Sequence, residues 1–113
     1  MKLAAGVFVG ILAVAAAAPA LAADAGMADG KNVYEKWCAP CHAPGPKHPG
    51  TQALQALYKG EKPAALIERQ DLTPDFIATF VRNGVSVMPP FRKTEIGDKD
   101  LAALGAFLSH GAK

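Results

Sequence analysis

Both cysteines of this chain lie in one short motif, and a histidine follows it directly. Two residues separate Cys38 from Cys41, and His42 comes next. This C-x-x-C-H pattern is the attachment sequence of a c-type haem, in which each thiol adds to one vinyl group of the porphyrin. The imidazole then lies under the iron as its proximal ligand. The motif predicts one covalent haem c, held by Cys38 and Cys41 and coordinated by His42.

Two other kinds of site share this cysteine spacing, and the surrounding sequence argues against both. A redox pair of the thioredoxin type follows a strand in a βαβ pattern, whereas residues 29–37 read as helix. A structural zinc ion needs four ligands. Beyond the motif the chain offers only His48 and His110, and it has no second cysteine pair. Haem attachment is therefore the interpretation we adopt.

In a small haem electron carrier, the other axial ligand of the iron is a Met or a second His, and Met raises the reduction potential. The candidates are Met27, His48, Met88 and His110. Met27 precedes the first expected helix, His48 is too close in sequence to His42 to cross to the other haem face, and His110 reads as a basic cap of the last helix. Met88 stands before Pro89 and Pro90, which stiffen the loop. A methionine can also simply fill a core gap, but we predict Met88 as the axial ligand.

The first 22 residues do not belong to the folded domain that we expect. Lys2 is the only charge before Asp24, and apolar or small residues fill the run between them. Ala20-Leu21-Ala22 has the A-x-A form of a signal-peptidase site, and the apolar run is shorter than the roughly 20 residues of a membrane span. We expect residues 1–22 to be a cleaved secretory signal peptide. Residues 23–113 would then form one small domain in the periplasm, without a membrane anchor.

Charge and size limit the partners and the source of stability. The chain has 12 Lys and Arg against 10 Asp and Glu, for a formal net charge of +2. A nucleic-acid partner would require a marked basic excess, so none is expected. A small exported domain usually needs a cross-link or a bound group to be stable. A Cys38–Cys41 disulfide would close too short a loop to restrict the unfolded chain. A haem would supply the missing core.

Capping residues and apolar periodicity divide the domain into four helices joined by long loops. The expected helices cover residues 29–37, 63–70, 74–83 and 99–110, with start signals at Asp29, Pro63, Thr73 and Asp98. Leu101, Leu104, Phe107 and Leu108 form one apolar stripe on the last helix. Gly30 lets the first helix approach it, with Tyr34 against Leu104 and Phe107. Residues 43–51 are too rich in Pro and Gly for a regular element, and loops this long are expected around a cofactor. The fold class is all-α.

Three features together resemble class I cytochromes c over the whole of residues 23–113: CAPCH at 38–42, Met88 within VSVMPPF, and the ending LGAFLSH. A narrower similarity is carried by PGTQAL at 49–54 and FVRNGVSVMPPFRKTEI at 80–96. These segments resemble the small cytochrome subunit of flavocytochromes that dehydrogenate 4-alkylphenols, of the p-cresol methylhydroxylase and eugenol hydroxylase type. The resemblance implies the same haem and iron ligands. It also implies a loop proline whose carbonyl accepts a hydrogen bond from the proximal imidazole, assigned to Pro49 with Pro44 and Pro46 as alternatives.

The resemblance also implies a function and its partners. An iron with both axial positions filled offers no place for oxygen or substrate, which favours transfer of one electron at a time. In the family, a flavoprotein dehydrogenase subunit oxidises the phenol and donates electrons, and a copper protein or another cytochrome accepts them. Two alternatives stay open. One is a free periplasmic cytochrome that serves an oxidase or another respiratory chain; the other is a haem sensor or peroxidase-like catalyst, which requires Met88 to leave the iron.

The docking surface is expected to include the Met88 loop. Arg92 and Lys93 either belong to this surface or form a solvated pair, whereas Phe91 is expected in the core. Arg82 lies on a helix, where it faces either a haem propionate or water.

Overall fold

The computed structural model describes the backbone of residues 18–110 and the side chains of residues 26–110. The predicted signal peptide, residues 1–22, therefore lies outside the described side chains, and most of it outside the described backbone. Within the described part, no helix is both long and apolar enough to cross a membrane.

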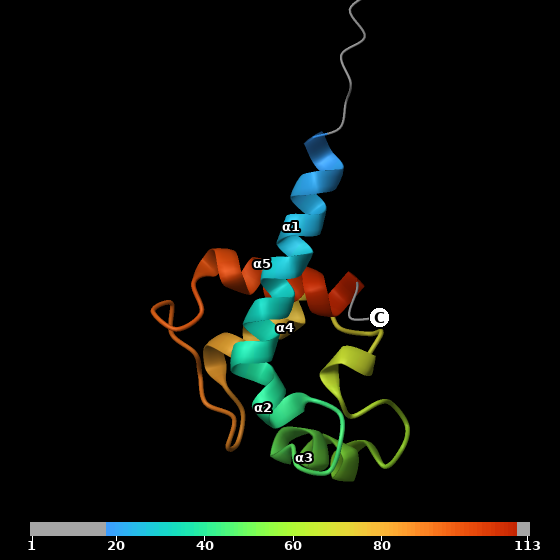
Figure 1. Cartoon of the computed structure of the whole chain (residues 1–113). Helices are drawn as coiled ribbons and strands as arrows, with labels where there is room; N and C mark the ends of the chain where they lie inside the picture. Colours follow the sequence, from blue (N-terminus) through green and yellow to red (C-terminus); the bar gives the residue numbers. More distant parts are fainter. Residues whose placement is uncertain (1–17, 111–113) are drawn as a thin grey trace, which may run out of the picture.

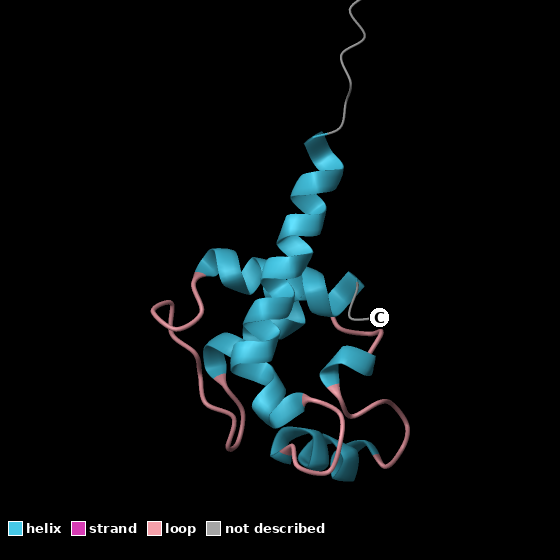
Figure 2. Ribbon diagram, viewed as in Figure 1, coloured by secondary structure: helices cyan, strands magenta, loops and turns pink. Residues whose placement is uncertain are grey.

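The described residues are mostly helical (Figure 2). The elements in order are α1 (Ala18–Val33), a π-helical turn η1 (Tyr34–Cys38), α2 (Ala39–His42), α3 (Pro49–Tyr58), a 3₁₀ turn η2 (Leu66–Glu68), α4 (Pro74–Asn83) and α5 (Asp98–His110). The first three follow one another without a break, so residues 18–110 contain four main helical segments and no strand. The all-α prediction is confirmed.

The prediction of a helix at residues 63–70 is wrong. Residues 63–70 contain only the turn η2, and Ala65 before it is extended, with φ −72° and ψ 131°. The additional helix is α3, which covers Pro49–Tyr58, and the next residue, Lys59, adopts a left-handed conformation with φ 51°. A proline in the first turn favours a helix start. Here Pro49 has that role, which the sequence analysis gave to Pro63.

Of the other three expected helix starts, Thr73 is confirmed, Asp29 is wrong, and Asp98 is the first residue of α5 instead of the residue before it. Asp29 was expected to cap the first helix, but it lies inside α1, which begins at Ala18. Helix α4 has the predicted bounds. The hydroxyl of Thr73 accepts a hydrogen bond from the backbone N–H of Phe76 at 3.2 Å, as an N-cap does.

Helix α1 crosses α5, and this is the most extensive contact between two helices (Figure 1). A Cβ placed on Gly30 would clash with the carbonyl of Ala103 and would lie 2.6 Å from Cβ of Phe107. The rings of Tyr34 and Phe107 are 5.9 Å apart. The missing side chain at Gly30 therefore permits the close crossing, as predicted.

The core lies where α1, α4 and α5 meet. Its buried members are Val33, Tyr34, Leu72, Ile77, Val81, Ile96, Leu104, Phe107 and Leu108. Trp37, Cys38 and Phe91 are partly buried and pack against this cluster. The core therefore supports both the segment that enters the cysteine motif and the loop that carries Met88.

Candidate haem-binding site

The cysteine motif occupies the end of the first helical segment. Cys38 is the last residue of the π-helical turn η1, and Cys41 and His42 belong to α2. Turns of this type recur at functional sites. Both thiols are free; Cys38 is half-buried against the core and Cys41 is exposed. The two thiols of the motif therefore differ in burial, and both would be available to hold a covalently bound group.

Burial sets the charge state of the motif. Burial, together with the nearby Cys41, raises the pKa of Cys38 to about 12, which keeps this thiol protonated at neutral pH. Burial also lowers the pKa of His42 and so favours the neutral imidazole. A neutral imidazole is the form that binds a metal.

The first turn of α3 packs directly against His42. A Cβ on Gly50 would lie 2.7 Å from Cε1 and 2.9 Å from Nδ1 of His42, and 2.8 Å from the carbonyl oxygen of Cys41. The hydroxyl of Thr51 donates to the carbonyl of Ala43 at 2.9 Å, which fixes this turn beside the motif. Only glycine leaves room for the ring at position 50. Nothing in the local sequence indicates this role of Gly50, although Gly50 belongs to the PGTQAL segment that carries the family resemblance.

The predicted hydrogen bond from the imidazole to Pro49 stays a prediction. Nδ1 of His42 is buried and has no hydrogen-bond partner within the described part of the chain. Pro49 adjoins Gly50, which contacts the ring. Of the two alternatives, the carbonyl of Pro46 accepts a hydrogen bond from the side chain of Gln52.

Met88 lies in a short closed loop after α4. The N–H of Val85 donates to the carbonyl of Met88 at 3.1 Å, and the N–H of Met88 returns a bond to the carbonyl of Val85 at 2.9 Å. Gly84 has φ +66°, and a Cβ on it would lie 2.8 Å from the nitrogen of Pro90. The N–H of Phe91 then donates to the carbonyl of Val81 at 2.7 Å and closes the loop. Met88 is half-buried within it.

An aromatic contact brings this loop to the cysteine motif. The rings of Trp37 and Phe91 meet edge to face, with centroids 5.8 Å apart and planes at 73°. Trp37 directly precedes Cys38, and Phe91 follows Met88 by three residues. Sequence positions about fifty residues apart are thus held side by side, and Phe91 packs against the core as expected. The assignment of His42 and Met88 as the two iron ligands stays a prediction.

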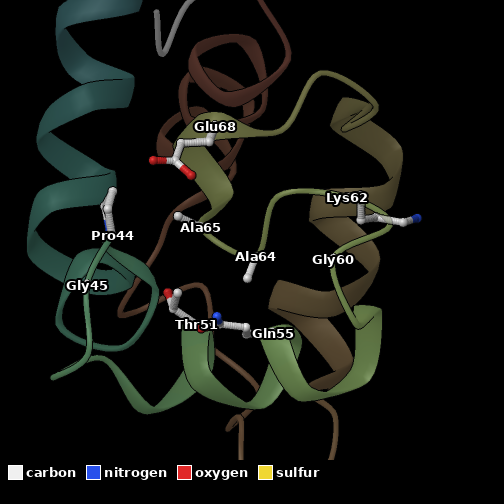
Figure 3. Close-up of a pocket in the computed structure, with 9 residues that line it drawn as sticks. All are labelled: Pro44, Gly45, Thr51, Gln55, Gly60, Lys62, Ala64, Ala65 and Glu68. Atoms are coloured by element: carbon white, nitrogen blue, oxygen red, sulfur yellow. The ribbon is translucent and has the colours of Figure 1, made fainter.

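The structure also has a cavity of about 310 Å³ beside α3 (Figure 3). It is lined by Pro44, Gly45, Thr51, Gln55, Gly60, Lys62, Ala64, Ala65 and Glu68. Pro44 and Gly45 follow the motif, but none of the four predicted haem and iron ligands lines the cavity. It therefore adjoins the candidate site and is distinct from it.

The donor set fits a c-type haem. The two thiols have the required spacing and lie at the end of one helical segment. One is half-buried against the core and the other is exposed. The adjoining imidazole is kept neutral, and its Nδ1 is buried without a partner in the described residues. Cys38, Cys41 and His42 would hold the group, and the contact between Trp37 and Phe91 brings the loop that carries Met88 to the motif.

Comparison with known proteins assigns the chain to a family. The family model described as "Cytochrome C oxidase, cbb3-type, subunit III" matches residues 25–108. The "4-cresol dehydrogenase [hydroxylating] cytochrome c subunit" of Pseudomonas putida is 31% identical over 87 residues, which are 77% of this chain and 64% of that protein. The chain thus spans slightly less than two thirds of this relative. No solved structure matches the chain significantly.

The family match covers the motif, the Met88 loop and all of the core described above. It begins inside α1 and ends two residues before the end of α5. We conclude that the chain belongs to the cytochrome c family described as cytochrome c oxidase, cbb3-type, subunit III, and is a haem electron carrier.

Proposed function

We propose that the chain binds one haem c through Cys38 and Cys41, with His42 and Met88 as the axial ligands of its iron. The bound haem would supply one-electron chemistry. His42 suits the proximal role because burial keeps its ring neutral and Gly50 leaves space beside it. Met88 suits the distal role because its loop is closed and held beside Trp37.

With both axial positions occupied by the protein, oxygen and organic substrates have no open position at the iron. The chain would therefore transfer electrons without acting on a substrate itself. The sensor or peroxidase alternative needs a displaceable Met88. The tight turn at residues 85–88 and the packing of Pro90 on Gly84 argue against easy displacement.

We further propose that the electron donor is a flavoprotein that dehydrogenates a 4-alkylphenol. The observation that carries this proposal is the similarity to the 4-cresol dehydrogenase cytochrome c subunit over 77% of the chain. The cytochrome would accept electrons one at a time and pass each to a soluble copper protein or another cytochrome. If residues 1–22 are a signal peptide, this exchange takes place in the periplasm.

The Met88 loop offers a surface for such a partner. Val85 and Val87 at its turn are 53% and 94% exposed. Arg92 and Lys93 are exposed on the same loop. Arg92 lies 3.7 Å from Glu95, and Lys93 lies 2.9 Å from Asp98, so both charges are partly compensated within the chain. An apolar tip flanked by compensated charges is typical of the centre and rim of a protein interface.

A second function is a freely diffusing periplasmic cytochrome for an oxidase or another respiratory chain. The description of the matching family names a cytochrome c oxidase, which is the kind of enzyme that such a cytochrome would serve. Purification of the exported protein separates the two. The flavocytochrome proposal predicts co-elution with a flavin-containing protein and reduction of the haem when a 4-alkylphenol is added. Elution alone, with no such reduction, would support the free cytochrome.

The haem attachment has its own test. Replacing both Cys38 and Cys41 by Ala removes the covalent bonds, and we expect little folded protein because the haem is part of the core. Circular dichroism and the yield of exported protein measure this. Normal folding of the double variant without haem would contradict the proposed architecture.

A further inference from the structure

We propose that Arg82 is a positioning residue that holds the Met88 loop in the conformation in which the thioether binds iron. This inference rests on the proposed role of Met88. It assigns Arg82 a role different from the two that the sequence left open, a propionate contact or an exposed charge.

Arg82 lies in the last turn of α4 and reaches across to the segment that returns from the loop. Its Nη1 donates to the carbonyl of Phe91 at 3.1 Å and to the carbonyl of Ile96 at 2.8 Å. Its Nη2 donates to Oδ1 of Asp98 at 3.0 Å. The side chain is only 24% exposed. One guanidinium thus joins the end of α4 to three points along residues 91–98.

These acceptors lie at the anchors of the loop. Phe91 also bonds to the carbonyl of Val81 through its N–H and contacts Trp37 through its ring. Ile96 is fully buried, with 0% exposure. Asp98 opens α5 and also accepts a bond from Lys93 at 2.9 Å. Arg82 therefore fixes both ends of the returning segment against the helix from which the Met88 loop departs.

The chemistry of the contact requires arginine. A guanidinium presents its donors in a rigid planar fork, whereas lysine carries its three donors on one nitrogen. Two backbone carbonyls and a carboxylate oxygen in different directions match the fork. Hydrogen bonds from a charged donor are stronger than neutral ones. Without Arg82, the carbonyls of Phe91 and Ile96 lose a partner, and partly buried carbonyls are rarely left unpaired.

The test compares Arg82→Met with Arg92→Met in the oxidised holoprotein. Arg92→Met is the matched control because it removes the same charge from the segment that Arg82 contacts, and the side chain of Arg92 is 81% exposed. The readouts are the long-wavelength thioether-to-iron absorption band and the affinity for imidazole, which competes with Met88. We expect Arg82→Met to weaken the band and raise the imidazole affinity about tenfold or more, a change that corresponds to about 1.4 kcal/mol. Arg92→Met should change neither.

Two further variants keep the test decisive if Arg82→Met does not fold. Arg82→Lys retains the charge but loses the fork. Asp98→Asn weakens the Nη2 contact and also the bond that Asp98 accepts from Lys93, and it leaves the two carbonyl contacts of Arg82 in place. Both variants should raise the imidazole affinity, Arg82→Lys more. Wild-type affinity in these variants, with or without a lower unfolding temperature, would overturn the inference. Absence of the thioether band from the wild-type protein would instead overturn the assignment of Met88 itself.

Discussion

Replacing Gly50 by Ala places a methyl group against the candidate proximal ligand. The new Cβ would lie 2.7 Å from Cε1 of His42, whereas ordinary contact begins at 3.4 Å. The ring or the first turn of α3 must therefore move by 3.4 − 2.7 = 0.7 Å. Backbone of the motif blocks one route, because the carbonyl oxygen of Cys41 would be only 2.8 Å away. Overpacking of this kind costs about 1–3 kcal/mol.

The assay is denaturant unfolding of the oxidised holoprotein, together with its reduction potential. We expect the free energy of unfolding to fall by about 1–3 kcal/mol and the potential to shift, because the imidazole changes its orientation. Gly26→Ala is the matched control. A Cβ on Gly26 has nothing within 4 Å, and alanine in a helix adds up to about 1 kcal/mol of stability. Wild-type stability and potential in Gly50→Ala would refute the packing of α3 against the imidazole.

Three further changes test other parts of the site and fold. Met88→Ala should lower the reduction potential and open the iron to carbon monoxide, and an unchanged potential would count against Met88 as a ligand. Gly84→Ala forces a side chain into a position with φ +66° and 2.8 Å from the nitrogen of Pro90. We expect the free energy of unfolding in denaturant to fall by about 1–3 kcal/mol and the thioether band to weaken. A thioether band of wild-type strength would contradict the role of Gly84 in holding the Met88 loop. Asp71 pairs with Arg69, whose side chain is 5% exposed, and this pairing lowers the pKa of Asp71 to about 2. The carboxylate therefore adds stability above its ordinary pKa of 3.8, and this contribution is lost as the pH falls toward 2. Asp71→Asn should cost about 1 kcal/mol at neutral pH, since Asp71 is half exposed, and should remove this part of the pH dependence; identical acid-unfolding curves would contradict it.

The parts of the site that follow from local chemistry could be predicted from the sequence. The C-x-x-C-H motif depends on residue type and spacing alone. Helix α4 begins at a cap formed by Thr73 and ends before Gly84, and both signals lie within the helix's own sequence. The close approach at Gly30 followed from the apolar stripe of the last helix.

The parts that depend on contacts between distant segments could not be predicted. Pro49 and Pro63 are equivalent by local rules, and the contacts of Gly50 and Thr51 with the motif are what distinguish α3. The partners of Arg82 lie 9 to 16 residues further along the chain, so its helix position gave no indication of them. Asp29 resembled a helix start because the domain was expected to begin at residue 23, only a few residues before it.

The central claim is that a haem is covalently bound to Cys38 and Cys41. The most direct measurement is the intact mass of the exported protein after complete denaturation, with the visible spectrum of the same sample. The account predicts a red polypeptide whose mass exceeds that of the processed chain by one haem. A colourless polypeptide with the mass of the unmodified chain would contradict it.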